Sequence, residues 1–362
     1  MTRRFTIDGS PELEAHIASD MDAVQKAVLE TASICPIEAL VLGGGYGRGE
    51  GGVLRENGEE TVYNDYDFFV IVPDVSRLRR KSLQSRLCVV GERLGHSLGI
   101  HVDFGAPIRV SALPHLPYEL MLMELREGHR VIAGPPDILE KMPRYTSERV
   151  PLIEGARLLM NRGTGLVLAG QKIRAGVNDE ESHQFVVRNI QKAMLACGDV
   201  VLMRRDAYSP VCVRRREFFE RLDLRGVPQS DELYARYLEA LEFKLHPRHT
   251  APKDSTLASW HKEACALFEA IHGWFEHERL GTPQGDWEAY SAIATRTGVP
   301  SAAEGLMNIY RNLRAGGLSR WRQGRLRLSP LDHLLRELPR VLYGWADATS
   351  EERYLQFWGK VS

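Results

Sequence analysis

The stretch Gly43-Gly-Gly-Tyr-Gly-Arg-Gly-Glu-Gly-Gly52 is followed, after a short polar insertion, by Asn64-Asp-Tyr-Asp-Phe-Phe-Val-Ile-Val72. The first part has too many glycines for the interior of a helix or strand, so we expect a turn whose backbone N–H groups can approach an anionic ligand closely. The second part is apolar from Phe68 to Val72, which is typical of a strand buried on both faces. The sequence therefore predicts a glycine turn that leads into a buried strand.

Two carboxylates stand at the start of that strand. Asp65 and Asp67 are two residues apart, and because side chains alternate along a strand, both point to the same side. Carboxylate oxygens are the ligands that Mg²⁺ prefers, and a neighbouring phosphate-binding turn suits a nucleoside triphosphate. The pattern therefore indicates a centre for nucleotidyl transfer.

Gly44-Gly-Tyr-Gly-Arg-Gly-Glu50 together with Asp65-x-Asp67 resembles the signature of the DNA polymerase β-like nucleotidyltransferase superfamily, in which a glycine turn precedes an Asp-x-Asp strand. The wording of the turn is similar to that in the transferase domain of the bacterial PII-protein uridylyltransferases. The resemblance covers residues 36 to 135. Here Gly51 to Tyr63 adds polar residues between the turn and the acid pair, and we interpret this insertion as an extended hairpin.

The resemblance implies the remaining site residues. In this superfamily a third carboxylate from a neighbouring strand completes the metal site, and Asp103 is the candidate in the right order. The alternative is that Asp103 only ends a strand near a turn. Gly44 and Gly45 are then expected to bind the β- and γ-phosphates through their backbone N–H groups. Arg48 either joins these contacts or braces the turn, and we favour bracing.

The implied reaction moves a nucleoside monophosphate from an NTP such as ATP to an acceptor hydroxyl and releases pyrophosphate. Asp65, Asp67 and Asp103 are expected to hold one or two Mg²⁺ ions, and Asp103 either ligates the second ion or accepts the proton of the hydroxyl. The uridylyltransferases also carry a His-Asp phosphohydrolase domain and regulatory domains, which we do not identify in this sequence. Only the transfer activity is therefore implied.

Composition bounds the number of domains and the partners. The chain has 362 residues, of which 43% are hydrophobic, and this length favours two folded domains over one core. Its 47 Lys and Arg residues balance 48 Asp and Glu residues, so nucleic acid, which needs a basic field, is disfavoured as a partner. The five scattered cysteines indicate reduced thiols, and no apolar run reaches membrane-spanning length. We therefore expect a cytoplasmic protein that does not contact a membrane.

Prolines mark the expected domain boundary, because four of them punctuate residues 135 to 151. We expect an α+β fold, with a nucleotidyltransferase-like mixed sheet flanked by helices over residues 1–140 and an all-α domain over residues 150–362. In the first domain the patterns predict helices over 10–31, 76–94 and 118–127 and strands over 39–42, 100–104, 108–113 and 128–134. In the second they predict helices over 152–174, 182–203, 231–243, 255–279, 301–314 and 330–343.

Basic residues of the second domain are candidates for binding anions. Arg188 and Lys192 share a charged stripe with Asp199 on the predicted helix over 182–203. Members of the superfamily often hold the triphosphate with basic residues from such a helix, and the alternative is a solvated helix face. Residues 204–225 hold seven arginines against four acids. They could hold an anionic acceptor, but surface solvation is the default interpretation.

Three classes of function remain open at this point. We favour a nucleotidyltransferase that acts on a small molecule or a protein, with the helical domain forming the acceptor cleft. An enzyme acting on an RNA end, such as a tRNA-directed toxin, would need a basic patch like the arginines of 204–225, and the near-zero net charge counts against it. A catalytically silent nucleotide-binding scaffold is the third class, and the retention of three acids beside the glycine turn argues against it.

Overall fold

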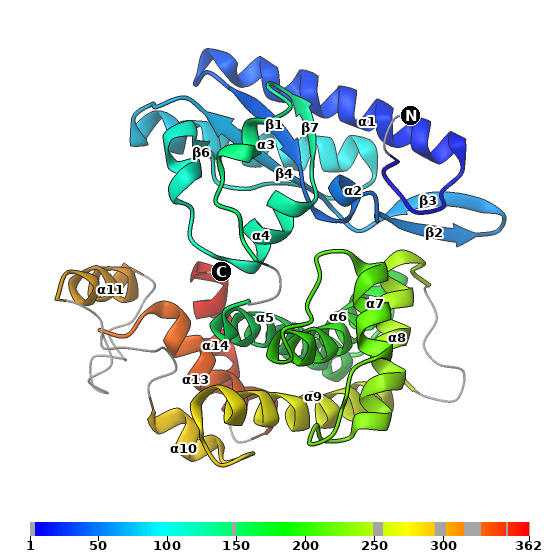
Figure 1. Ribbon diagram of the computed structural model, residues 1–362, viewed down its shortest axis with the longest axis vertical. Coiled ribbons are helices and arrows are strands. Elements are labelled where there is room, and N and C mark those ends of the chain that lie inside the picture. Colours follow the sequence, from blue (N-terminus) through cyan, green and yellow to red (C-terminus); the bar gives the residue numbers. More distant parts are fainter. Residues whose placement is uncertain are drawn as a thin grey trace. The chain divides into compact units, whose positions relative to one another are not determined.

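The structure is a computed structural model that describes residues 4–146, 150–248, 256–293, 302–314, 327–344 and 347–361 (Figure 1). The chain divides into two units, of which the first combines a sheet with helices and the second is helical, in agreement with the expected fold class. The first unit consists of Met1–Arg149, Ser209–Glu217 and Leu241–Arg248. The second consists of Val150–Tyr208, Phe218–Ala240 and His249–Ser362. Two segments of the first unit thus come from beyond the expected boundary.

The first unit opens with helix α1 (Pro11–Leu29), and local signals set its start. Ser10 is the N-cap residue, and its side chain accepts a hydrogen bond from Leu13 N at 3.2 Å. Proline occupies the first helical position, where no backbone N–H is needed. Ile17 and Val24 are buried on the inner side of this helix. The predicted helix over 10–31 is therefore confirmed, and a 3₁₀ turn, η1 (Glu30–Ser33), extends it.

The sheet of the first unit has the strand order β5-β4-β1-β7, with β6 also paired to β4. Strand β1 is antiparallel to β4 and β7, whereas β4 is parallel to β5 and β6. The strands are β1 (Ala39–Leu42), β4 (Tyr66–Val72), β5 (Val102–Phe104), β6 (Ile108–Arg109) and β7 (Arg130–Ala133). The expected mixed sheet is therefore confirmed.

The prediction of a strand over 108–113 is wrong beyond its second residue. Strand β6 ends at Arg109, and Val110–His115 forms a 3₁₀ helix, η2. Pro114 lies in this run and has no N–H to give to a sheet. The Ser111 hydroxyl instead bonds the carboxylate of Asp74, which holds the chain in its turn.

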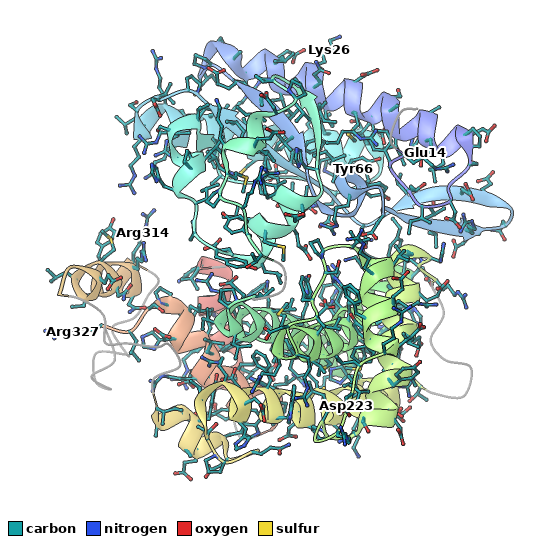
Figure 2. All side chains as sticks on the ribbon, in the orientation of Figure 1. Glu14, Lys26, Tyr66, Asp223, Arg314 and Arg327 are labelled. Atoms are coloured by element: carbon teal, nitrogen blue, oxygen red, sulfur yellow. The ribbon has the colours of Figure 1, made fainter. Side chains whose placement is uncertain are left out.

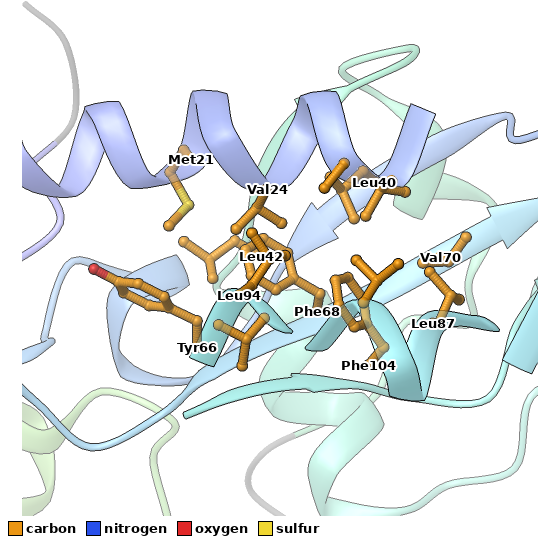
Figure 3. Close-up of a cluster of buried hydrophobic side chains, with 14 of the residues drawn as sticks. Met21, Val24, Leu40, Leu42, Tyr66, Phe68, Val70, Leu87, Leu94 and Phe104 are labelled. Atoms are coloured by element: carbon orange, nitrogen blue, oxygen red, sulfur yellow. The ribbon is translucent and has the colours of Figure 1, made fainter. Parts of the chain in front are cut away.

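The main core of the first unit lies on one face of the sheet, under α1 and α3 (Arg77–Leu98) (Figures 1 and 3). Leu42 of β1 and Phe68 of β4 point into this core together with Leu87 of α3. Tyr66, labelled in Figures 2 and 3, lies between the sheet and α1 and donates a hydrogen bond to Asp20 Oδ2 at 2.8 Å. Burial raises the pKa of both Tyr66 and Asp20. The bond therefore gives a partner to two polar groups that are buried in the core.

The polar insertion forms the expected hairpin, made of β2 (Gly52–Glu56) and β3 (Glu59–Tyr63). Its two-residue turn consists of Asn57 and Gly58, whose φ angles are 52° and 84°. Asn-Gly with two positive φ angles is the favoured turn for a tight hairpin, because its twist matches that of the strands. The hairpin thus separates the glycine stretch from β4 without disturbing the sheet.

The glycine stretch is not the open turn that its composition predicts. Gly44–Arg48 forms a short helix, α2, with Gly43 as its N-cap and Gly49 as its C-cap at φ 84°. Tyr46 in the middle of α2 is buried, and this tertiary contact offsets the conformational entropy that glycines lose in a helix. The turn predicted from glycine content is therefore wrong, because the packing of Tyr46 overrides the local propensity of the glycines.

The remaining helices include α4 (Leu120–Glu127) and the 3₁₀ helix η3 (Ile138–Lys141) in the first unit. From residue 150 onward, the described part of the chain contains helices and no strand. These helices are α5 (Leu152–Ala175), α6 (Glu180–Arg204), α7 (Cys212–Glu220), α8 (Ser230–Leu245), α9 (Leu257–Leu280), α10 (Trp287–Ala292), α11 (Ala302–Arg314), α13 (Pro330–Leu342) and α14 (Ala348–Val361). Residues 255 and 301, where two predicted helices begin, lie outside the described residues.

In the described ranges, no helix combines the length and the apolar character that crossing a bilayer requires.

Candidate functional site

Strands β4 and β5 place two of the predicted site residues side by side. The two strands are parallel, and their register pairs Asp67 with Asp103. Paired residues on neighbouring strands project from the same face of a sheet. Tyr66 and Phe68, which flank Asp67, point into the core under α1 and α3. Both carboxylates therefore project from the opposite face.

Asp65 joins this face from the end of the hairpin. It directly precedes β4 and is two residues from Asp67, so strand alternation sends both side chains the same way. Asn64 before it has a φ of 76°, a left-handed conformation that asparagine tolerates better than most residues. Asp65 and Asp67 are partly exposed and Asp103 is exposed. All three carboxylates can thus be reached by a ligand from solvent.

The three carboxylates have the right chemistry for Mg²⁺ without forming a closed cage. In the described parts of the chain, no three His, Cys, Asp or Glu side chains are gathered tightly enough to enclose a metal ion. Mg²⁺ commonly binds through one or two carboxylates, waters and the phosphates of its substrate rather than through a dedicated protein cage. Accessible carboxylates on one sheet face fit that mode of binding.

The start of α2 lies directly against Asp67. Gly43 N donates a hydrogen bond to Asp67 O at 2.8 Å, and Gly44 has a φ of 60°. A Cβ at Gly44 would collide with Asp67 Oδ2, so only glycine fits both the conformation and the space. Gly45 follows in the first helical turn, where N–H groups have no acceptor within the helix. The structure thus brings the two predicted phosphate-binding glycines to a predicted metal ligand.

Tyr46 fixes the base of the hairpin, a role that sequence reasoning missed. Its hydroxyl lies 2.9 Å from Gly52 O and 2.8 Å from Tyr63 O, and it accepts a hydrogen bond from Tyr63 N at 2.9 Å. Burial raises the pKa of Tyr46, which keeps the hydroxyl protonated. Tyr63 stands two residues before Asp65. The aromatic side chain among the glycines therefore holds the chain where it enters the carboxylate site.

Arg48 ends α2 inside the protein. Only 5% of its side chain is exposed, and its Nη1 donates to Glu124 Oε2 at 3.4 Å while its Nε lies 3.6 Å from Glu50 Oε2. Burial is the largest single effect and acts to lower the pKa of Arg48, but the neighbouring negative charges, Glu124 first among them, together outweigh it and the net shift is upward. These ion pairs connect α2 to α4, which is the bracing arrangement.

A later segment completes this buried cluster. Cys212 N donates to Glu50 Oε1 at 2.8 Å, and Arg215 Nη2 donates to Glu124 Oε1 at 2.5 Å. The side chain of Arg215 is 2% exposed, so the default of a solvated surface is wrong for this member of the arginine-rich stretch 204–225. Sequence reasoning missed the contact because Arg215 and Glu124 are 91 residues apart.

Arg188 and Lys192 lie on α6 in the second unit, with Arg188 partly exposed and Lys192 exposed. Their role as triphosphate contacts stays a prediction. Asp199, which the sequence grouped with them on a charged stripe, is instead buried and accepts a hydrogen bond from Tyr237 Oη at 2.7 Å. Asp199 therefore belongs to the packing of the second unit.

A cavity of about 660 Å³ lies between α3 and β5. Asp103 lines it together with Glu92 and His96 of α3. Small-molecule pockets typically enclose roughly 300 to 1,000 Å³. The cavity is therefore large enough for a metabolite or a short segment of a protein, but it lies on the α3 side of β5, whereas the Asp103 carboxylate projects from the other face of the sheet.

Comparison with known proteins does not identify a family for this chain. No protein-family model matches the chain, and no curated protein matches it. The proposed function therefore depends on the arrangement of the carboxylates and the glycines.

Proposed function

We propose that the protein is a Mg²⁺-dependent nucleotidyltransferase that moves NMP from an NTP to a hydroxyl of a small-molecule or protein acceptor. The observation that carries the proposal is the pairing of Asp67 with Asp103, with the backbone of Gly44 packed against the Asp67 carboxylate. A triphosphate bound together with Mg²⁺ requires carboxylates for the ion and, beside them, backbone N–H groups that the phosphates can approach closely.

Each residue has a distinct role in this proposal. Asp65, Asp67 and Asp103 would hold Mg²⁺, which supplies neutralisation of the negative charge that develops on the phosphates. Gly44 and Gly45 offer backbone N–H groups to the β- and γ-phosphates, and their lack of side chains lets the phosphates approach. Arg188 and Lys192 remain the proposed contacts from the second unit.

The transfer balances with one acceptor hydroxyl. Its oxygen forms a bond to the α-phosphorus, while the bond from the α-phosphorus to the bridging oxygen breaks and pyrophosphate leaves with that electron pair. Where it does not itself ligate a second Mg²⁺ ion, Asp103 accepts the hydroxyl proton, and its exposure makes it available to a bound acceptor.

We place the reaction in the cytoplasm. The five cysteines, all within the described ranges, are free thiols. Free thiols are typical of a reducing compartment, whereas small secreted domains often depend on disulfides.

The direct test is a transfer assay. The purified chain is incubated with Mg²⁺ and each of the four labelled NTPs against a panel of metabolites and proteins. The proposal expects label to appear on at least one acceptor together with released pyrophosphate. Labelled acceptor without pyrophosphate release would contradict the proposed chemistry.

Nucleotide binding provides a second test that needs no acceptor. Without a cation, the triphosphate would face two or three carboxylates, so binding should be weak in chelator and strengthen when Mg²⁺ is added. Titration calorimetry in both conditions measures the difference. Equal affinity with and without Mg²⁺ would favour a nucleotide-binding scaffold over an enzyme.

A further inference from the structure

A cluster of four charged residues, three of them buried and Glu124 partly exposed, connects α2 to a segment that lies far along the chain. Its members are two arginines, Arg48 and Arg215, and two glutamates, Glu50 and Glu124. Arg48, Glu50 and Arg215 are 9%, 5% and 2% exposed. Burying charge is costly unless each charge has a partner, so this cluster needs an explanation beyond the filling of space.

The two glutamates, Glu50 and Glu124, accept the contacts that hold the cluster together. Glu124 lies between the two guanidinium groups, with Oε2 at 3.4 Å from Arg48 Nη1 and Oε1 at 2.5 Å from Arg215 Nη2. Glu50 accepts the N–H of Cys212 on Oε1 and places Oε2 3.6 Å from Arg48 Nε. Arg215 also donates to the carbonyl of Pro210 at 3.2 Å. The segment Ser209–Glu217 therefore donates hydrogen bonds to both glutamates.

Glu50 connects this cluster to Gly44 and Gly45, the glycines proposed to bind phosphate. Glu50 N donates to Gly45 O at 2.8 Å, which ties the end of the glycine stretch back to its beginning. Gly44, next to Gly45, packs against the Asp67 carboxylate. Helix α2 is only five residues long. A displacement of Arg48 or Glu50 is therefore expected to move Gly44 as well.

We propose that Arg215 is a positioning residue for nucleotide binding, acting through Glu124 and Arg48 to keep Gly44 and Gly45 beside Asp67. This inference rests on the proposed function, since it assigns a purpose to the same site. Buried ion pairs add little net stability compared with apolar packing, but they fix the geometry of the groups that they join. A site that loses its supporting contacts becomes too loose to bind well while the fold persists.

The test compares Arg215→Met with Arg214→Met in the full chain. Both substitutions remove one guanidinium from α7, but Arg214 is exposed and Arg215 is buried. Two quantities are measured at a temperature where circular dichroism shows each variant folded. One is amide hydrogen exchange over residues 43–50, and the other is the calorimetric Kd of the Mg²⁺ complexes of ATP, GTP, CTP and UTP.

In Arg215→Met we expect exchange over residues 43–50 to accelerate about tenfold or more, because local opening becomes easier. We expect the Kd for the NTP that the wild type binds best to weaken by about tenfold, a change of about 1.4 kcal/mol. Arg214→Met should change neither quantity. If Arg215→Met does not fold, Arg215→Lys serves instead, since it keeps the charge but has fewer donors and should give smaller changes of the same sign.

Two further outcomes separate the inference from the proposed function. A folded Arg215 variant that melts earlier but keeps wild-type exchange over residues 43–50 and wild-type Kd would overturn the positioning role. If the wild-type chain binds none of the four nucleotides, the proposed function fails and takes the nucleotide-positioning role with it. In that case the exchange data still decide whether Arg215 holds α2 in place.

Discussion

The two faces of the sheet in the first unit carry different kinds of side chain at the start of β4. Tyr66 and Phe68 of β4 point into the core under α1 and α3, whereas Asp65 and Asp67 point away from it. Farther along β4, Ile71 lies on the Asp67 face and is also buried. The polar surface is therefore confined to the start of the strand, where α2 and β5 meet it.

This difference teaches how one strand serves both fold and chemistry. Alternating positions let the core hold β4 rigidly while the carboxylates remain open to ligands. Substitutions on the two faces should therefore separate the two roles. Changes on the carboxylate face should affect transfer and spare the fold, and changes on the core face should do the reverse.

The largest effect is expected on the carboxylate face. Asp65→Asn or Asp67→Asn should lower the rate of transfer by orders of magnitude, because each removes a charge that holds the metal. The fold should persist, since losing one of several neighbouring negative charges relieves repulsion. The transfer assay measures the rate, and Asp22→Asn on the exposed side of α1 is the control. Near wild-type turnover in either variant would show that the metal assignment is wrong.

On the core face, Phe68→Ala should cost stability. Phe68 is 1% exposed and stacks on Phe104 with ring centroids 5.5 Å apart. Its loss should lower the free energy of unfolding by about 3 to 5 kcal/mol, as measured by urea unfolding. Leu78→Ala is the control, because Leu78 is 78% exposed and should change stability by less than about 0.5 kcal/mol. Equal losses in both variants would refute the assignment of the core face.

Tyr46→Phe should have a smaller effect, and it tests the connection between the two faces. The ring of Tyr46 belongs to the core cluster, while its hydroxyl bonds the base of the hairpin at Gly52 and Tyr63. Removing the hydroxyl removes its hydrogen bonds to these buried backbone groups, at a cost of about 1 to 3 kcal/mol in unfolding free energy. Urea unfolding of this variant is compared with Tyr234→Phe, which changes a more exposed tyrosine. A cost no larger than that of the control would mean that the hydroxyl does not anchor the hairpin.

Much of this fold could be predicted from local sequence signals. The pair Ser10-Pro11 marked the start of α1, and the apolar runs marked β1 and β4. Such signals act within one or two helical turns or strand repeats, so each can be recognised from a short window of sequence. Asp65 and Asp67 stand out as candidate ligands from their spacing at the start of a strand, whereas Asp103 is a candidate only through the resemblance to the superfamily.

Contacts between distant segments could not be predicted in the same way. Glycine content indicated an open turn, yet the burial of Tyr46 stabilises α2 within it. The arginine-rich stretch indicated a solvated surface, yet Arg215 pairs with Glu124. Both features depend on partners brought in by the folded chain, which override local propensity. The direct register of Asp67 with Asp103 is likewise a property of the sheet rather than of either strand.

The smallest effect is expected for RNA, and it concerns charges away from both faces of the sheet. An RNA acceptor held by Arg204, Arg205 and residues 214–216 would release counterions, so its affinity would fall steeply with salt. In the structure Arg204 pairs with Glu278 at 2.7 Å and Arg215 is buried, which leaves fewer of these charges to contact phosphates. We therefore expect no salt-steep binding of tRNA in filter-binding or anisotropy titrations, and no change when Arg204 and Arg205 become alanine. Tight binding that weakens by several powers of ten between low and physiological salt, and whose salt dependence flattens in the alanine variants, would instead establish RNA as the acceptor.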